Sequence, residues 1–245
     1  MKRTILATDL DGTFLGGSAD QRRALYDWIG EHRDELMLIY VSGRSLATMR
    51  DVLEELPFHP DHVIADVGTT VLSGPAWQPM PALQTWLDAR WSWHSAVDVA
   101  RYLANAYPAL EPQPVVEGRR LSYFFTPGEN LAALSAVVEA AGFDALASGG
   151  RYFDVLPRGV NKGSTLLRTL DALGLPRDRT LVAGDTLNDL SLFQTGLRGV
   201  AMVDSEPALL HAVAGWPHVR HSQHPGAAAI LPELHALHGT AEVAP

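Results

Sequence analysis

Short apolar runs alternate with amphipathic segments along most of the chain. Each run has the length and the unbroken apolar character of a strand buried on both faces of a sheet. The segments between the runs repeat apolar residues at the spacing of an amphipathic helix. Strands that alternate with helices form a parallel sheet covered by helices on both faces. We therefore predict a doubly wound α/β core with strands at residues 4–8, 36–41, 62–68, 180–184 and 199–203.

This alternation is interrupted in the middle of the chain. The pattern changes near Gly74-Pro75 and again at residues 80–83, and a separate series of helices and short strands continues to about residue 157. Beyond that point the first pattern resumes. The sequence therefore predicts one core made of residues 1–78 and 158–245, interrupted by a smaller inserted α/β domain at residues 79–157.

The composition narrows the classes of partner. The chain of 245 residues has a formal net charge of −9 and no cysteine. A broad nucleic-acid surface needs clustered Lys and Arg, so this acidity argues against one. The lack of cysteine excludes disulfides, thiolate catalysis and zinc–thiolate sites. Because no stretch approaches the apolar length of a membrane span, we expect a cytoplasmic protein with no nucleic-acid or membrane partner, and a monomer by default.

The first polar cluster directly follows the first predicted strand. Ligands of open parallel sheets bind at the carboxyl ends of the strands, and Asp9 and Asp11 lie at such an end, followed by Gly12. One interpretation is a turn, in which Asp and Gly are common. Two carboxylates at one buried edge also repel each other and lose hydration. A metal ion or a catalytic pair at this edge offsets that cost.

Two further clusters add groups that bind anions. Ser42 and the amide of Gly43 follow the second predicted strand and can donate hydrogen bonds to an anion. Ser45 is alternatively placed to cap the next helix. Lys162 opens a helix after the insertion, where its ammonium can reach the same edge of the sheet. A single lysine is otherwise most often a solvated surface residue, so neither cluster identifies a site alone.

A fourth cluster follows the predicted strand at residues 180–184. Asp185 and Asp189 lie four residues apart, with Asn188 between them. Carboxylates at a helix start can act as caps, which explains Asp185 better than it explains both residues. All four clusters fall at one edge of the predicted sheet. Together they suit Mg²⁺ and phosphate, because Mg²⁺ takes oxygen ligands and shares them with substrate phosphates.

The series DLDGT, VSGRS, NKG and GDTLND resembles the four signature motifs of the haloacid dehalogenase (HAD) superfamily, in its phosphatase branch. The resemblance spans nearly the whole chain. The insertion resembles the C2-type cap of the subclass that contains Cof-type and sugar phosphatases. Three segments are most similar to those of bacterial sucrose-phosphate phosphatases, namely RLSYFFTP, SGGRYFDVLPRGVNKG and GDTLNDLSLFQTGLRGVAMVDSEPALLHAV. The resemblance implies a HAD-like, Rossmannoid core with an inserted cap.

The resemblance also implies a role for each core residue. Asp9 is expected to be the nucleophile that forms an aspartyl-phosphate, and Asp11 the general acid and base. Mg²⁺ is expected to be held by Asp9, the Asp11 carbonyl and Asp185, with Asp189 acting directly or through water. The groups expected around the substrate phosphate are Ser42, the Gly43 amide, Arg44, the catalytic Lys162 and Asn188, which orients Lys162 or the phosphate.

The inserted cap is expected to exclude water and to recognise the leaving group. The predicted sugar contacts are Arg119, Arg120, Tyr123, Arg151 and Asn161. The sequence thus predicts a Mg²⁺-dependent phosphatase for a sugar phosphate, most simply sucrose 6-phosphate or a similar disaccharide or glycoside phosphate. One alternative is a Cof-type HAD phosphatase for another small phosphometabolite. Another is a sugar phosphomutase, which keeps both aspartates, although the mutases resembled carry a different cap. A non-catalytic module would lack a motif residue, and none is missing.

Overall fold

A twisted eight-stranded sheet forms the larger part of the molecule. The computed structural model describes residues 4–115, 118–126 and 128–242. The strand order is β12-β11-β10-β1-β2-β3-β4-β5, and all neighbouring pairs from β12 to β3 are parallel. The parallel strands are β1 (Thr4–Thr8), β2 (Leu36–Val41), β3 (His62–Ala65), β10 (Thr180–Gly184), β11 (Arg198–Ala201) and β12 (Val219–His221); β4 (Thr70–Ser73) and β5 (Gln78–Pro79) add an antiparallel edge.

Helices cover both faces of this sheet, which confirms the predicted doubly wound fold. Side chains of alternate strand residues enter opposite layers, so Leu6 packs in one apolar cluster while Ile5 and Ala7 pack in the other. The first layer contains α1 (Ala19–Glu31), α2 (Leu46–Glu55) and α9 (Ala227–Glu242), and the second contains α3 (Pro81–Asp88), α6 (Lys162–Leu173), α7 (Leu190–Phe193) and α8 (Pro207–Ala212).

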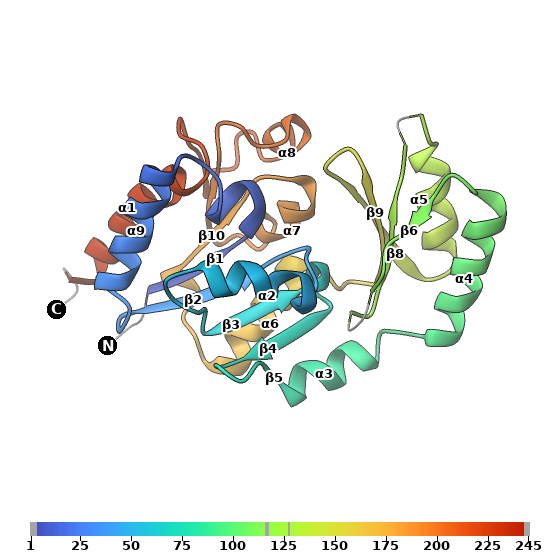
Figure 1. Cartoon of the computed structure of the whole chain (residues 1–245), viewed down its shortest axis with the longest axis horizontal. Coiled ribbons are helices and arrows are strands. Elements are labelled where there is room, and N and C mark those ends of the chain that lie inside the picture. Colours follow the sequence, from blue (N-terminus) through green and yellow to red (C-terminus); the bar gives the residue numbers. More distant parts are fainter. Residues whose placement is uncertain (1–3, 116–117, 127, 243–245) are drawn as a thin grey trace.

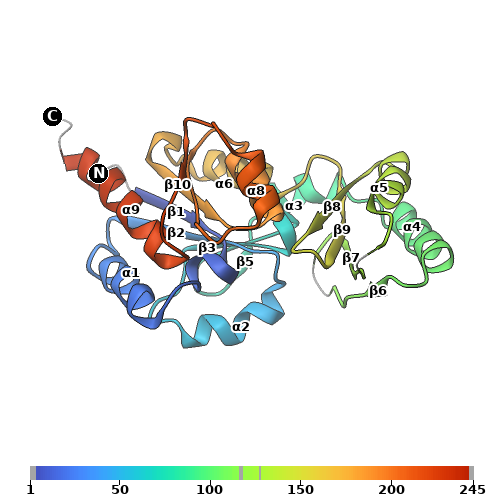
Figure 2. The same ribbon diagram turned by 90° about the horizontal axis from the view of Figure 1, so that it is seen from above.

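A second sheet belongs to the insertion. Its four antiparallel strands have the order β6-β7-β9-β8. They are β6 (Glu111–Pro112), β7 (Leu121–Phe124), β8 (Phe143–Ser148) and β9 (Tyr152–Pro157). Helices α4 (Trp93–Ala106) and α5 (Leu131–Ala140) cover the side of this sheet that is remote from the large sheet (Figures 1 and 2). The opposite side of the small sheet therefore faces the large domain.

Helix α3 packs against the large domain, unlike the rest of the predicted insertion. Leu83, Trp86 and Leu87 join the apolar cluster of the large domain, whereas Trp91 joins the cluster under the small sheet. The sequence-based boundary at residue 79 assigns α3 to the insertion. We propose instead that the insertion begins between α3 and Trp91, because packing changes partner there.

The strand predicted at residues 62–68 ends earlier than expected. β3 stops at Ala65, since Asp66 and Val67 adopt φ values of 53° and 58°. These values lie in the left-handed region, which cannot continue a strand and is unfavourable for a β-branched residue. Residues 66–68 form a tight turn, here called the β3 turn.

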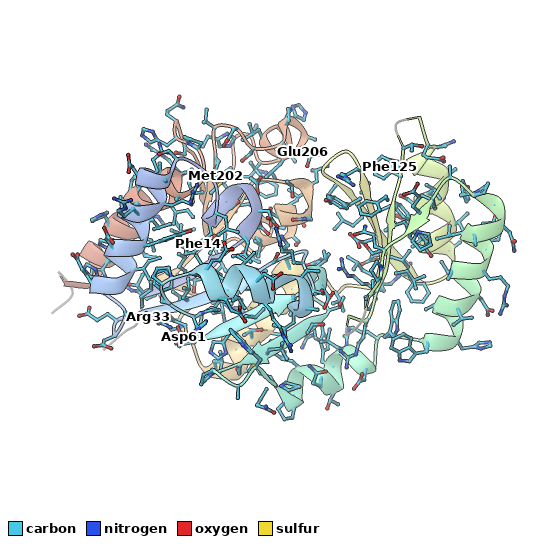
Figure 3. All side chains as sticks on the ribbon, in the orientation of Figure 1. Phe14, Arg33, Asp61, Phe125, Met202 and Glu206 are labelled. Atoms are coloured by element: carbon cyan, nitrogen blue, oxygen red, sulfur yellow. The ribbon has the colours of Figure 1, made fainter. Side chains whose placement is uncertain are left out.

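The two ends of the large sheet differ in what they carry. At the amino ends of β2 and β3, Arg33 donates a hydrogen bond of 2.9 Å to Asp61, and Figure 3 shows the two side chains close together there. The carboxyl ends carry the polar clusters predicted above and lie toward the small sheet. Among the described helices, none combines the length and apolar character needed to cross a lipid bilayer.

Candidate active site

Neighbouring carboxyl ends of the large sheet bring the polar clusters together. The Asp9 amide donates a 3.0 Å hydrogen bond to the Ala183 carbonyl, which holds the end of β1 against β10. The chain then turns through the short helical segment Leu10–Phe14, in which Gly12 has φ of 74°. A Cβ atom at Gly12 would overlap the carboxylate of Asp185. Glycine at this position therefore lets the first and fourth motifs approach each other.

Lys162 joins three of the motifs. Its side chain is fully buried at the first turn of α6. The Nζ atom donates hydrogen bonds to Asp9 Oδ1 at 2.7 Å, to Asn188 Oδ1 at 2.7 Å and to Asp189 Oδ1 at 2.6 Å. These three bonds use every proton of the ammonium. Burial by itself disfavours the charged amine, but the Asp189 and Asp9 carboxylates outweigh it and raise the pKa of Lys162.

Asp189 lies beneath Lys162 and fixes its position. While Oδ1 accepts from Lys162, Oδ2 accepts from the amides of Asp185 and Thr186, each at 3.1 Å. Glu206 also holds the loop that contains Asp185 and Thr186, because its Oε2 accepts from the Leu187 amide at 2.8 Å. Figure 3 shows Glu206 at the start of α8. Both oxygens of Asp189 are thus engaged in orienting the lysine and the loop.

Asp9 and Asp185 are carboxylates whose charge needs compensation. Burial raises the pKa of Asp9, Lys162 opposes this rise, and Asp189 and Asp185 add to it. Burial followed by the Asp189 charge raises the pKa of Asp185 to about 7, although the Thr13 hydroxyl donates to it at 2.8 Å. A cation between the two carboxylates would favour their ionised forms.

The oxygen donors fit a magnesium ion. Ligand oxygens of Asp9, Asp185 and Asp189 lie within 4.8 Å of one another, and carboxylate oxygens are the ligands that Mg²⁺ prefers. Since both oxygens of Asp189 already accept hydrogen bonds, Asp9 and Asp185 are the better placed direct ligands. Asp189 fits the role of a residue that orients the site.

The second motif forms a loop beside these residues. Ser42 is buried, and its amide donates to the Ile64 carbonyl at 2.8 Å. Its hydroxyl accepts from the Arg44 amide at 3.1 Å. Ser45 caps α2 by accepting from the Thr48 amide, as the structural interpretation of this motif predicted. Residues 42–44 lie directly ahead of the start of α2 and are here called the phosphate loop, after the role that the sequence predicts for them.

Arg44 makes a contact that the sequence did not predict. Its guanidinium forms a two-point ion pair with Asp11, with Nε at 2.7 Å from Oδ2 and Nη2 at 2.6 Å from Oδ1. Hydrogen bonding to Asp11 raises the pKa of Arg44 against the effect of burial. The Asp11 side chain is 56% exposed, so this pair holds an accessible carboxylate at the entrance to the site.

A cavity of about 630 Å³ lies between the phosphate loop and the small sheet. Asp9, Asp11, Gly43, Arg44 and Asn188 line its large-domain side. The lining from the insertion combines polar and apolar groups, namely Gln113, Pro114, Arg120, Ser122, Phe124, Ser148, Gly149, Tyr152 and Asp154. A more open hollow of about 690 Å³ beside β12 lies among Arg198, Arg220 and Glu233, and Asp9, Asp11 and Asp185 are not part of its lining. Of these two hollows, the first joins Asp9 and Asp11 to the insertion.

Four of the predicted sugar residues do not line this cavity. Arg119 donates to Asp88 at 2.8 Å and to Gln84 at 2.8 Å, next to α3. Tyr123 is buried in the apolar cluster under the small sheet. Arg151 lies over the ring of Phe124, and Asn161 caps α6 by accepting from the Ser164 amide. Arg120 is the member of the predicted set that lines the cavity.

The alternation of residues in β7 and β9 explains this outcome. Tyr123, Phe153 and Val155 point into the apolar cluster, while their neighbours Ser122, Tyr152 and Asp154 line the cavity. Burial raises the pKa of Asp154, and the Arg120 charge opposes that rise. The period-two pattern of YFDVLP is the sequence signal that separates Asp154 and Tyr152 from the apolar residues of β9.

Known proteins resemble this chain over most of its length. Residues 2–237 match the family model described as sucrose-6F-phosphate phosphohydrolase. The chain is 44% identical over 232 residues to the glucosylglycerol-phosphate synthase of Pseudomonas anguilliseptica, which covers 93% of this chain and 30% of that protein. It is 30% identical over 224 residues to the probable sucrose-phosphatase 3a of Arabidopsis thaliana, covering 85% of this chain and 52% of that protein. The chain thus spans about a third to a half of the length of these two relatives.

A solved structure resembles both domains. The sucrose-phosphatase of Synechocystis sp. PCC6803, in complex with sucrose and phosphate, superposes with a TM-score of 0.85 at 26% identity. The superposition covers 97% of this chain and 99% of that one. The similarity therefore includes the small sheet as well as the large one.

Proposed function

The chain belongs to the sucrose-6F-phosphate phosphohydrolase family of the HAD superfamily, and from this premise we propose that it hydrolyses the phosphate ester of a sugar or glycoside. The observation that carries the proposal is the buried Lys162, bonded at once to Asp9, Asn188 and Asp189 beside a cavity that reaches the insertion. This arrangement supplies a nucleophile, a fixed positive charge and room for a leaving group.

In the first step, an Asp9 carboxylate oxygen attacks phosphorus and the bond from phosphorus to the sugar oxygen breaks. Lys162, the Gly43 amide and Ser42 stabilise the charge on the phosphoryl oxygens. Asp11 gives its proton to the departing sugar oxygen. For this transfer the Asp11 carboxyl has to turn from Arg44 toward the leaving oxygen. The products are an aspartyl-phosphate at Asp9 and the free sugar hydroxyl.

In the second step, Asp11 takes a proton from water, and the water oxygen attacks the phosphorus of the aspartyl-phosphate. The bond to Asp9 breaks, which releases inorganic phosphate and restores the carboxylate. When bound, Mg²⁺ would be held by Asp9, Asp185 and the Asp11 carbonyl, where it would neutralise phosphate charge. Asp189 and Asn188 keep the Lys162 ammonium bonded to the Asp9 carboxylate.

The cavity supports a substrate larger than a simple phosphate ester. The insertion contributes Arg120, Ser122, Ser148 and Asp154, which can bond to sugar hydroxyls, and the apolar walls Phe124 and Tyr152. We propose these side chains as the sugar contacts, in place of Arg119, Tyr123, Arg151 and Asn161. Sucrose 6-phosphate and a phosphorylated glucosylglycerol are the two candidate substrates, because relatives named for sucrose and for glucosylglycerol phosphate align with this chain.

Release of inorganic phosphate from a panel of sugar and glycoside phosphates tests the proposal. We expect turnover that requires Mg²⁺ and that is lost in Asp9→Asn. The matched control is Asp61→Asn, a substitution of the same type at the other end of the sheet. Absence of turnover on every member of the panel with Mg²⁺ present, or full activity in Asp9→Asn, would contradict the proposal.

A further inference from the structure

The β3 turn is held in a strained conformation by contacts with the catalytic elements. The Asp66 amide donates to the Arg44 carbonyl at 2.8 Å, and the Val67 amide donates to the Ser42 carbonyl at 3.1 Å. Thr165 of α6 donates to the Gly68 carbonyl at 2.8 Å. Left-handed backbone at Asp66 and Val67 is unfavourable, and it persists where the surroundings fix it. The turn is therefore tied to the phosphate loop and to the helix that carries Lys162.

The Asp66 side chain reaches from this turn to the insertion. It is fully buried, and its Oδ1 lies 3.2 Å from Nη2 of Arg120. Its Oδ2 accepts from the Thr70 hydroxyl at 2.8 Å. A Cβ atom at Gly118 would lie 2.7 Å from Asp66 Cβ, so glycine at that position allows the insertion to approach the turn so closely. Asp66 thus joins the two domains where the Gly118 backbone lies close to its side chain.

Arg120 is shared between two carboxylates from different domains. Its other terminal nitrogen, Nη1, donates to Asp154 Oδ1 at 3.0 Å. The Arg120 side chain is 10% exposed and lines the cavity. A buried guanidinium is stable only when paired, and here the pairing partners lie on β9 of the insertion and on the β3 turn of the large domain. Asp66 and Asp154 therefore flank the guanidinium in the cavity wall, one from each domain.

We propose that Asp66 is a positioning residue for substrate specificity, which holds the Arg120 guanidinium at the sugar end of the cavity and couples it to the phosphate loop. This inference rests on the proposed function, because it assumes a sugar phosphate as the substrate. Asp66 touches no reacting atom, and it acts through Arg120. A phosphate ester whose leaving group extends to the insertion depends on this arrangement. An ester with a small aromatic leaving group, such as p-nitrophenyl phosphate, depends on the same large-domain residues and does not extend to Arg120.

The test compares both substrates in Asp66→Asn, which keeps the shape of the side chain and removes its charge. We expect kcat/KM for the sugar phosphate to fall about 10- to 100-fold, mainly through KM, because a polar contact to the substrate is misplaced. We expect kcat/KM for p-nitrophenyl phosphate to change by less than about threefold. Asp61→Asn, which breaks the Arg33 pair at the other end of the sheet, should change neither value. Equal losses on both substrates, or no loss on the sugar phosphate, would overturn the proposal.

A second set of variants separates positioning from loss of folding. Arg120→Met should reproduce the substrate-dependent loss, and Arg120→Lys should recover part of it. The double variant Asp66→Asn/Arg120→Met should be no worse than Arg120→Met, because both changes remove one shared arrangement. Additive losses would mean that Asp66 acts independently of Arg120.

Crystal structures of the wild-type protein and of Asp66→Asn provide a readout that needs no sugar. We expect Arg120 to leave the cavity wall while Lys162 and the phosphate loop stay in place. An unmoved Arg120 would overturn the positioning role. If the wild-type protein releases phosphate from no sugar phosphate, the proposed function fails, and the position of Arg120 still decides this inference.

Discussion

The Nζ atom of Lys162 lies 2.6 Å from Oδ1 of Asp189, and both side chains are fully buried. Burying a charged pair costs the hydration free energy of both groups. This cost is offset only when every charged atom has a hydrogen-bond partner. Asp189 completes its pairing through two backbone amides, and Lys162 through Asp9 and Asn188. The pair therefore sets the position of a positive charge beside Asp9.

Lys162→Met should abolish turnover and destabilise the protein, because Asp9 and Asp189 would then face each other without a cation. Breaking a buried ion pair in this way costs about 3–5 kcal/mol. Thermal unfolding and phosphate release measure the two effects. Mg²⁺ should restore part of the stability, since it offsets the same charges, and should not restore the activity. Near-normal activity in Lys162→Met would exclude the role assigned to the lysine.

Asp11→Asn should separate the two chemical steps. p-Nitrophenolate is a good leaving group and needs little protonation, so the variant should release about one equivalent of it rapidly. Later turnover should be about 10²- to 10⁴-fold slower than in the wild-type protein, because water is no longer activated. Rapid-mixing absorbance measurements follow both phases. A steady rate without an initial burst would argue against Asp11 as the base of the second step.

Stabilisation by Mg²⁺ should increase with pH. The folded pKa of Asp185, about 7, lies above its ordinary value of 3.8. Without a cation, the contribution of this group to stability is retained below pH about 4 and is lost as the pH rises through about 7. Mg²⁺ competes with the proton for the carboxylate, so its effect on Tm should be small at about pH 5 and larger at about pH 8. A shift of equal size at both pH values would contradict this prediction.

Gly12→Ala should damage the site, and Gly174→Ala should not. Both glycines have positive φ, at 74° and 63°, so each substitution costs about 1–2 kcal/mol of backbone strain. At Gly12 the added methyl would also overlap Asp185, whereas the space around Gly174 is open within 4 Å. Calorimetric titration with Mg²⁺ should show weaker binding in Gly12→Ala and wild-type binding in Gly174→Ala. Equal affinity in both variants would mean that Asp185 can move without consequence.

The sequence predicted the sheet and the gathering of the motifs because both follow from local patterns. Apolar runs mark the parallel strands, and Asp9, Lys162 and Asp189 meet because carboxyl ends of neighbouring strands share one edge. The β3 turn was not predictable, since contacts with Ser42, Arg44 and Thr165 hold it against the preference of its residues. The pairing of Arg44 with Asp11 depends on side-chain rotamers, which no spacing specifies.

Residue type alone does not specify which residues of the small sheet line the cavity, for a physical reason. Each residue of its strands faces either the cavity or the apolar cluster, depending on strand register. A register shift of one position would move every side chain to the opposite face. Tyr123 and Arg119 have the chemical type of sugar contacts, but Tyr123 packs in the apolar cluster and Arg119 pairs with Asp88. Asp154 lines the cavity because its position alternates with those of Phe153 and Val155, which pack in the apolar cluster.

The alternation along β9 also has an evolutionary consequence. Phe153 and Val155 maintain the packing of the insertion, whereas Tyr152 and Asp154 border the cavity. Mutations at the second pair can change which leaving group is accepted while the first pair keeps the fold intact. Related chains can therefore diverge in the sugar that they recognise by single substitutions within one strand, with the catalytic aspartates and lysine left unaltered.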